Sequence, residues 1–188
     1  MTDETARGRR RDAQRNAQAI LDAAAAVFVE SGVQAPVREV ADRAGVGMGT
    51  LYRHFPTRAD LVVAVYRHQV DAAAAAGPTL LRDSATPAAA LHAWVTLFVE
   101  FLVTKHGLAD ALQGDTERFS ALHQLLTDRL VPVCAELLDA AAPQGAPVEA
   151  YAFLRGIGNL CIGGAAPGYD PERLAHLLVD GALAASGS

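Results

Sequence analysis

The segment that most constrains the fold spans residues 37–58 and reads VREVADRAGVGMGTLYRHFPTR. Within it, Val37, Val40 and Ala41 recur at the i, i+3 and i+4 spacing of a short helix with one apolar side. Gly45 follows soon after, and a glycine adopts a positive φ at little cost. The pattern therefore predicts a short helix that runs into a tight turn at Gly45.

A second short helix is expected directly after the turn, from roughly Met48 to His54. Val46 can fill the angle between the two helices, while Leu51 and Phe55 form the buried side of the second one. Two short helices joined in this way form a helix-turn-helix, whose second helix fits a B-DNA major groove about 12 Å wide. The outward-facing residues of this helix are Met48, Gly49, Thr50, Tyr52, Arg53 and His54.

These residues resemble the DNA-binding domain of TetR/AcrR-type transcriptional repressors, whose helix-turn-helix ends in a G-T-L-Y-x-x-F-like run, here Gly49 to Phe55. The similarity extends back to an amphipathic helix over residues 20–31 and forward to Thr57, about a third of the chain. More loosely, the run LHAWVTLFVEFLVTKHGLADAL is similar to the C-terminal domain of an actinobacterial subgroup of these regulators. The resemblance implies an all-α homodimer that binds a near-palindromic operator in double-stranded DNA. It also implies a small-molecule effector, held in the second domain, that releases the protein from the operator.

The expected recognition helix departs from the family pattern at its first positions. Family members commonly have Ser and then Lys there, whereas this chain has Gly47 and Met48. Because Met48 cannot neutralise a phosphate, we expect the salt dependence of DNA binding to be weaker by up to about one charge per subunit. We predict that bases are faced by Arg38, Thr50 and Met48, and that phosphates are contacted by Tyr52, His54, Arg58 and the amides near Gly47, with Gly49 and Arg53 on the same surface.

Two domains of opposite charge are expected: residues 13–58 bind DNA, and residues 59–188 form a helical domain for ligand binding and dimerisation. Alanine, leucine and valine dominate and alternating β-branched residues are scarce, so the predicted fold class is all-α with about nine helices. The formal charge of −5 is uneven, since residues 1–67 carry +2 and residues 68–188 carry −7. Local charge governs attraction to phosphates. Residues 1–67, called the head below, are therefore the part expected to bind DNA.

At the start of the head, residues 1–12 hold four arginines and no apolar anchor, which predicts a disordered basic arm. Such an arm is either a solvated tail or a segment that follows DNA phosphates.

Two long helices are expected to be limited by proline. The helix that begins after the N-cap Thr57 should end near Ala76, because Gly77 and Pro78 follow. Pro132 should bend or break a helix over about residues 115–141.

A broad apolar face is expected on the helix over residues 87–105 and on the one over residues 115–141. This face holds much of the aromatic content of a chain that has few aromatic residues. A cluster of aromatic side chains is typical either of core packing or of the wall of a drug-sized site. His92, Glu100 and His123 are candidate polar anchors within it. The predicted pocket residues are Tyr66, Trp94, Leu97, Phe98, Phe101, Phe119, His123 and Leu126.

Two final helices are expected over about residues 148–162 and 170–185. Their glycines superficially suggest a phosphate-binding loop, but no strand precedes them and no lysine follows. Small residues also let a second helix approach closely, and the family resemblance implies a four-helix dimer interface here. The predicted interface residues are Tyr151, Leu154, Arg155, Gly158, Asn159, Leu174, Leu177, Leu178 and Gly181.

Other function classes find little support in the sequence. It has no HExxH, nucleophile-elbow, Walker-loop or paired Cys/His motif, so we predict no enzyme, no cofactor and no metal site. Cys134 and Cys161 lie in apolar surroundings without a CxxC partner, which favours reduced thiols in the cytoplasm. No signal peptide and no apolar run of about 18 residues is apparent, so no membrane span is expected. The alternative function is a dimeric DNA-binding module without a ligand, whose second domain would have a solid core.

Overall fold

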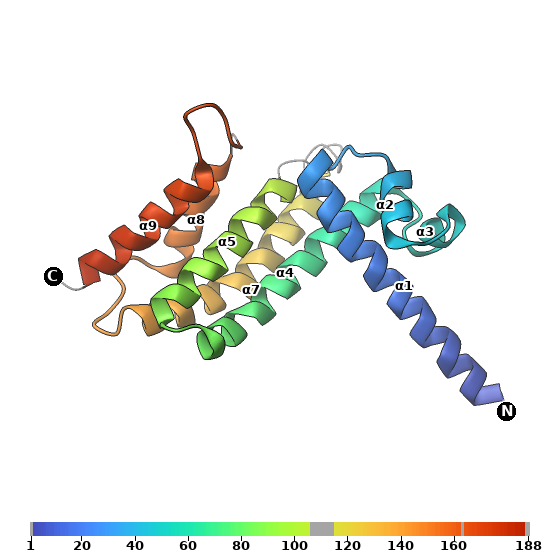
Figure 1. Ribbon diagram of the computed structural model, residues 1–188, viewed down its shortest axis with the longest axis horizontal. Helices are drawn as coiled ribbons and strands as arrows, with labels where there is room; N and C mark the ends of the chain where they lie inside the picture. The colour runs from blue at the N-terminus through green and yellow to red at the C-terminus, as the bar shows by residue number, and fades with distance from the viewer. Residues whose placement is uncertain (1, 106–114, 163, 187–188) are drawn as a thin grey trace.

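The computed structural model describes residues 2–105, 115–162 and 164–186, and these residues form an all-α fold, as the sequence predicts (Figure 1). Across those ranges the extended structure amounts to one isolated β-bridge, between Ala166 and Tyr169. In Figure 1 a small head lies at one end of the molecule, and the C-terminal helices lie at the other. The helices are α1 (Thr2–Ser31), α2 (Val37–Ala44), α3 (Met48–His54), α4 (Arg58–Asp83), α5 (Pro87–Lys105), α7 (Thr116–Ala141), α8 (Ala150–Cys161) and α9 (Pro171–Ser186).

Residues 2–12 are helical, whereas the sequence predicted a disordered arm over residues 1–12. Helix α1 begins at Thr2 and projects from the head as a single rod (Figure 1). Alanine, arginine and glutamine are good helix formers, so a helix anchored by Ile20 and Phe28 in the core extends backwards at low cost. An ion pair of 3.7 Å between Arg15 and Asp12 lies on this exposed part.

Helix α4 begins where predicted but does not end there. The Asp60 amide donates to Thr57 Oγ1 and the Thr57 amide donates to Asp60 Oδ2, both at 3.1 Å, which forms a capping box. The predicted end near Ala76 is wrong, because α4 continues through Gly77 and Pro78 to Asp83. A proline inside an isolated helix costs about 3 kcal/mol. The last turns of α4 pack against the core, and this packing offsets that cost.

The predicted break at Pro132 is also wrong, since α7 runs without interruption from Thr116 to Ala141. Asp115 caps its first turn by accepting a 2.9 Å hydrogen bond from the Arg118 amide. Pro132 faces solvent, while Leu130 and Leu137 on either side of it are fully buried. The apolar side of α7 therefore stays in the core on both sides of the proline.

At Gly77, α4 and α7 lie very close together. A Cβ placed on Gly77 would lie 2.3 Å from Val133 Cγ1, a distance that atoms cannot adopt. Val133 is β-branched and strongly prefers one χ1 rotamer in a helix, so it cannot easily move aside. The two helix backbones can therefore lie this close only because residue 77 has no side chain.

We expect Gly77→Ala to lower the free energy of unfolding by about 1–2 kcal/mol, because overpacking a core typically costs 1–3 kcal/mol. In an open helix the same change would stabilise by about 0.5–1 kcal/mol. Gly49→Ala is the matched control, because nothing lies within 4 Å of a Cβ on Gly49. Urea unfolding of both variants and of Gly77→Ala combined with Val133→Ala measures the effect. A stabilised Gly77→Ala variant, or no rescue by Val133→Ala, contradicts the prediction.

Two histidines join α5 to α9. His92 Nδ1 and His176 Nδ1 lie 2.8 Å apart, so one ring donates a hydrogen bond to the other. His92 Nε2 lies 3.0 Å from Asp180 Oδ1, and Thr96 Oγ1 lies 3.1 Å from His176 Nε2. The sequence suggested His92 as a polar anchor inside a pocket. In the structure it is instead part of a polar contact that positions α9.

Cys134 and Cys161 are free and buried, as predicted. Burial raises the pKa of the Cys134 thiol to about 12 and also raises the pKa of Cys161. Both thiols therefore remain protonated near neutral pH and are poor nucleophiles. Within the described ranges, no helix is long and apolar enough to cross a membrane.

Candidate DNA-binding surface and effector cavity

The turn between α2 and α3 has the geometry that the sequence predicts. Gly45 adopts φ 67° and ψ 28°, a left-handed conformation that favours glycine. Its amide donates to Asp42 O at 3.2 Å, and the Val46 amide donates to Ala41 O at 3.0 Å. These two bonds use the carbonyls at the end of α2 and hold the chain in the sharp reversal that a helix-turn-helix needs.

Helix α3 presents one face to the core and the other to solvent. Leu51 is fully buried and Phe55 is 9% exposed, whereas Tyr52 is 46% exposed. Gly47 is the N-cap, in an extended conformation and without a side-chain cap. The predicted outward face is therefore present in the structure, with Gly49, Tyr52 and Arg53 exposed and Met48, Thr50 and His54 half-buried.

Two predicted DNA contacts are joined to each other on this face. Arg53 Nε donates to Gly49 O at 3.0 Å, and Arg53 Nη2 donates to Thr50 Oγ1 at 3.1 Å. The guanidinium thus lies along α3 and orients the threonine hydroxyl.

The sequence predicts a phosphate contact for Arg58, and in the structure its guanidinium donates hydrogen bonds within the head. Its Nε and Nη2 donate to Val33 O at 3.2 and 2.8 Å, and Nη2 also donates to Ala35 O. Val33 and Ala35 lie in the loop between α1 and α2 and are buried. Arg58 is half-buried and ties the first turn of α4 to this loop, so it holds the helix-turn-helix in place.

Helix α2 is further fixed to α1 by a 2.8 Å ion pair between Arg43 and Glu30, which raises the pKa of Arg43 through the hydrogen bond and the charge of Glu30. Arg38, the predicted base contact on α2, is exposed.

Helices α1 and α4 join the head to the rest of the described chain, called the body below. His68 Nε2 lies 2.8 Å from Asp22 Oδ1 and 3.2 Å from Gln18 Nε2. Helix α4 itself runs from the head along α5 and α7 of the body (Figure 1). A movement of α4 in the body would therefore be transmitted to the head.

The body contains a cavity of about 360 Å³ between α5, α7 and α8. Apolar side chains of all three helices form most of its wall, and polar groups of α7 and α8 complete it. Its size lies within the range of about 300–1,000 Å³ that is usual for small-molecule sites. The lining residues are Phe98, Leu102, Phe119, His123, Leu126, Thr127, Val131, Tyr151, Leu154, Arg155, Gly158, Asn159 and Ile162.

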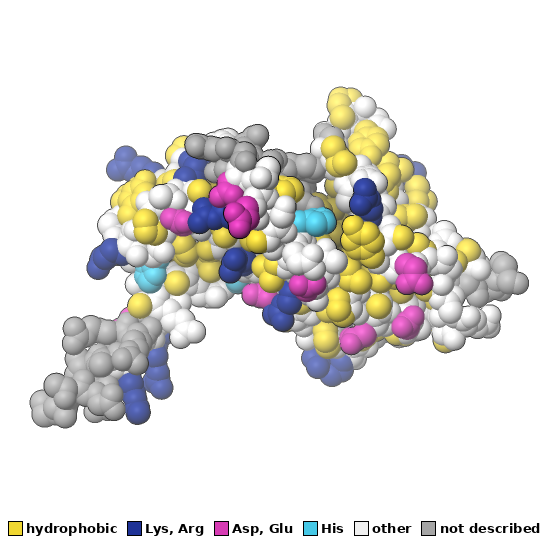
Figure 2. Space-filling view, turned by 180° about the vertical axis from the view of Figure 1, so that it is seen from behind, with side chains coloured by type: hydrophobic (Ala, Val, Ile, Leu, Met, Phe, Trp, Pro, Cys, Tyr) yellow, Lys and Arg dark blue, Asp and Glu magenta, His cyan; other side chains and the backbone are white. Residues whose placement is uncertain are grey.

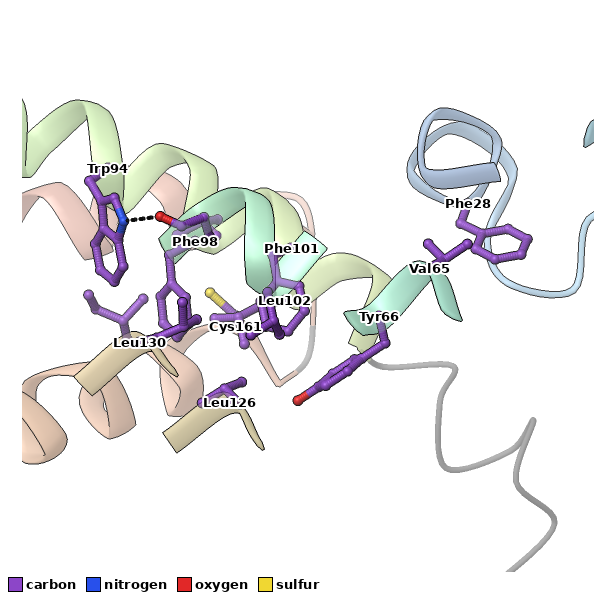
Figure 3. Packing of buried hydrophobic residues seen from close by; sticks show 14 of the residues in the cluster. Phe28, Val65, Tyr66, Trp94, Phe98, Phe101, Leu102, Leu126, Leu130 and Cys161 are labelled. Atoms are coloured by element: carbon purple, nitrogen blue, oxygen red, sulfur yellow. Dashed lines mark hydrogen bonds between the residues drawn. The ribbon is translucent and has the colours of Figure 1, made fainter. Parts of the chain in front are cut away.

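Half of the predicted pocket residues line this cavity: Phe98, Phe119, His123 and Leu126. Trp94 does not line it, because its ring is fully buried and stacks on Phe98 with ring centroids 5.7 Å apart (Figure 3).

Tyr66 is likewise part of the core rather than the cavity wall. It is 3% exposed and its ring centroid lies 5.0 Å from that of Phe101. The Tyr66 hydroxyl has no hydrogen-bond partner among the described residues, and burial raises its pKa.

Leu97 and Phe101 lie along a second hollow of about 440 Å³, between α1, α4 and α5, together with the predicted polar anchor Glu100. This hollow is larger but more open, and small alanine side chains and two carboxylates contribute much of its lining. The first cavity is the better candidate for a drug-sized ligand, because it has an aromatic and aliphatic wall with few polar groups.

Part of the cavity wall was not among the residues predicted to form a pocket. On α7, Phe119, His123, Thr127 and Val131 follow one another at i, i+4 spacing, which is a signal that could have identified all four. On α8, five residues predicted for the dimer interface line the cavity instead or as well: Tyr151, Leu154, Arg155, Gly158 and Asn159. Leu154 is only 4% exposed and therefore packs mainly within its own subunit.

Apolar side chains remain exposed on the C-terminal helices, which lie at the right of Figure 2. Among the predicted interface residues, Leu177 is 56% exposed, Tyr151 44% and Leu178 37%. Gly181 is exposed and Leu174 half-buried. Ile162, which the prediction omitted, is 67% exposed directly after α8. An apolar surface of this kind favours contact with another protein surface.

Comparison with protein families places the head in a known group. Residues 20–65 match the model of bacterial regulatory proteins of the tetR family. The HTH-type transcriptional repressor KstR2 of Rhodococcus jostii is 31% identical over 116 residues, which are 58% of this chain and 57% of KstR2. An HTH-type transcriptional regulator of Staphylococcus aureus is 41% identical over 63 residues, 33% of this chain and 34% of its own length. The chain thus spans about half or less of these curated relatives.

Solved structures are similar over nearly the whole chain. The TetR transcriptional regulator SCO0520 from Streptomyces coelicolor is 35% identical, with a TM-score of 0.68 over 90% of this chain and 97% of that protein. A TetR regulatory protein from Mycobacterium vanbaalenii is 32% identical, with the same TM-score of 0.68 over 92% and 98% of the two chains. The TetR-like regulator LfrR from Mycobacterium smegmatis, solved in complex with proflavine, is 25% identical, with a TM-score of 0.61 over 93% and 96%.

Proposed function

Since the chain belongs to the TetR family of transcriptional regulators, which are not enzymes, we propose that it is a repressor released from DNA by a small, largely apolar effector. It binds a near-palindromic operator as a homodimer, in the cytoplasm. The effector occupies the cavity between α5, α7 and α8. The relative LfrR in complex with proflavine supports a small-molecule site in this fold.

One contact carries the proposed link between effector and DNA. Phe98 lines the cavity and stacks on Trp94, and Trp94 Nε1 donates a 2.8 Å hydrogen bond to Ala73 O of α4 (Figure 3). A ligand that displaces Phe98 therefore acts through Trp94 on the helix that begins in the head. The coupling free energy expected for such a pair of sites is about 1–3 kcal/mol, and DNA must weaken effector binding by the same factor.

The dimer sets how the two heads meet DNA. Each head reads one half-site, and successive major grooves on one face of B-DNA lie about 34–36 Å apart. The exposed apolar surface of α8 and α9 is the proposed contact between subunits, because it would bury Leu177 and Ile162.

The test is selection of duplex DNA from a random pool by the purified protein, repeated in the presence of candidate effectors. A palindromic consensus whose recovery falls with an apolar small molecule is the expected result. A consensus that no compound affects would favour the alternative function, a dimeric DNA-binding module without a ligand. The cavity of about 360 Å³ favours the effector-responsive function over that module.

Arg38 and Tyr52 allow base and phosphate contacts to be separated. Arg38→Ala is expected to weaken binding to the selected operator by about 1–3 kcal/mol and to relax sequence preference at one position. Tyr52→Phe removes a hydroxyl proposed to contact phosphate, so it should weaken operator and random DNA alike. Fluorescence anisotropy measures the affinity of each variant, relative to wild type, for the operator duplex and for a random duplex. Equal losses on specific and random DNA for Arg38→Ala would refute its role in base reading.

A further inference from the structure

The cavity between α5, α7 and α8 has a positively charged side chain in an otherwise largely apolar wall. Among the described residues, its lining includes one arginine, Arg155, and no aspartate or glutamate. Phe98, Leu102 and Leu126 supply buried apolar surface on the α5 and α7 side. A molecule in this cavity therefore meets hydrocarbon along one side and a cation at the α8 wall.

Arg155 is exposed, and its side-chain hydrogen-bond partner is a tyrosine hydroxyl rather than a carboxylate. On α8, Tyr151, Arg155 and Asn159 follow at i, i+4 and i+8, so they form one polar ridge along the cavity. Arg155 Nη1 donates to Tyr151 Oη at 3.4 Å. No carboxylate of the described residues forms an ion pair with Arg155, whereas the two arginines of α7 do have such partners: Arg118 pairs with Asp60 at 3.9 Å and Arg129 with Asp71 at 2.6 Å.

A guanidinium that lines an apolar cavity selects its ligand by charge. Its planar donors match the two oxygens of a carboxylate, and charge-assisted hydrogen bonds are about twice as strong as neutral ones. A cationic ligand would face repulsion from Arg155, and the described part of the cavity wall offers no carboxylate to offset it.

We propose that the effector is an amphipathic anion, whose carboxylate or similar head group binds Arg155 and whose apolar body lies against Phe98, Leu102 and Leu126. This inference rests on the proposed effector response and specifies its chemistry. Tyr151 and Asn159 flank the head group and complete its hydrogen bonds.

The chain contains its own reporter for the test. Trp94 is the single tryptophan, and it stacks on Phe98, which lines the cavity. Titration of the full-length protein with decanoate, decanol and decylamine, followed by tryptophan emission and by calorimetry, compares three head groups on one apolar body. We expect decanoate to bind at least tenfold more tightly than decanol, a difference of about 1.4 kcal/mol, and decylamine to bind more weakly than either.

Arg155→Gln is expected to reduce the preference for decanoate over decanol to about twofold, mainly because decanoate binds more weakly. Arg82→Gln is the control, because Arg82 is exposed at the end of α4, does not line the cavity and pairs with Asp83 at 3.0 Å. The molar mass of each variant, measured by light scattering, shows whether Arg155 also contributes to the contact between subunits. A dimeric Arg155→Gln variant that has lost the preference supports the proposal, and one that retains it overturns it.

The outcomes also separate this inference from the proposed function. If all three compounds bind alike and release operator DNA, the effector response stands and the inference about the head group fails. If none of them binds, the inference fails, and operator release by other compounds decides the proposed function independently.

Discussion

Leu177→Glu is expected to lower operator affinity at least about 100-fold, because two linked heads bind DNA about 10²–10⁴ times more tightly than one. Leu177 lies on α9 and is 56% exposed in the single subunit, so a charged side chain there leaves the subunit fold intact. In the proposed homodimer the same position lies against the second subunit. A buried, unpaired carboxylate on each side of that contact is costly.

Leu97→Glu is the matched control, because Leu97 is 38% exposed on α5 and outside the C-terminal helices. Both variants gain the same charge in the same acidic domain. Light scattering and operator anisotropy should show a monomer with weak DNA binding for Leu177→Glu, and a dimer with wild-type binding for Leu97→Glu. A dimeric Leu177→Glu variant with wild-type affinity would place the contact between subunits elsewhere.

Arg58→Met is expected to lower the free energy of unfolding by about 2–4 kcal/mol, because a hydrogen bond to a charged group contributes about 1.5–3 kcal/mol and Arg58 makes such bonds to two carbonyls. Methionine retains an apolar stem of similar length, so the decrease in the free energy of unfolding measures the contribution of the guanidinium. For a protein of this size the thermal midpoint should fall by about 2–4 °C for each kcal/mol. Operator affinity should also fall, because the loop that leads into α2 loses its anchor.

Salt dependence distinguishes this anchoring role from the phosphate contact expected from the sequence. An anchoring Arg58 predicts a large loss of stability and an unchanged slope of log affinity against log salt. A phosphate contact predicts unchanged stability and a slope smaller by about one. Arg67→Met on the exposed side of α4 is the control and should leave stability unchanged. An Arg58→Met variant of wild-type stability would restore the phosphate role.

The helix-turn-helix could be predicted residue by residue because its determinants are local. Gly45 provides the positive φ, Val40 and Ala41 mark the buried side of α2, and Leu51 marks that of α3. Each of these signals acts within one or two turns of helix, so the sequence around it is sufficient. The all-α class follows for the same reason, since apolar side chains repeat at helical spacing along most of the chain.

The cavity was only half predicted, because its walls come from helices far apart in the sequence. Phe98 and Trp94 are neighbours on one apolar stripe of α5, yet one lines the cavity and the other is fully buried and donates to α4. Arg155 lies on α8, where small residues and the family resemblance predicted a contact between subunits. The periodicity of a single helix cannot show which neighbouring helix covers which part of its apolar side.

The amino-acid order alone thus determined the helices, the turn and the outward face of α3, because backbone conformation and amphipathicity depend on near neighbours in the chain. The tertiary structure decided that α4 passes through Pro78, that Arg58 binds the loop before α2, and that α8 lines a cavity. These features depend on packing free energies between distant segments. Such packing outweighs the local cost of a proline. It also brings the Arg58 guanidinium to backbone carbonyls of the protein itself.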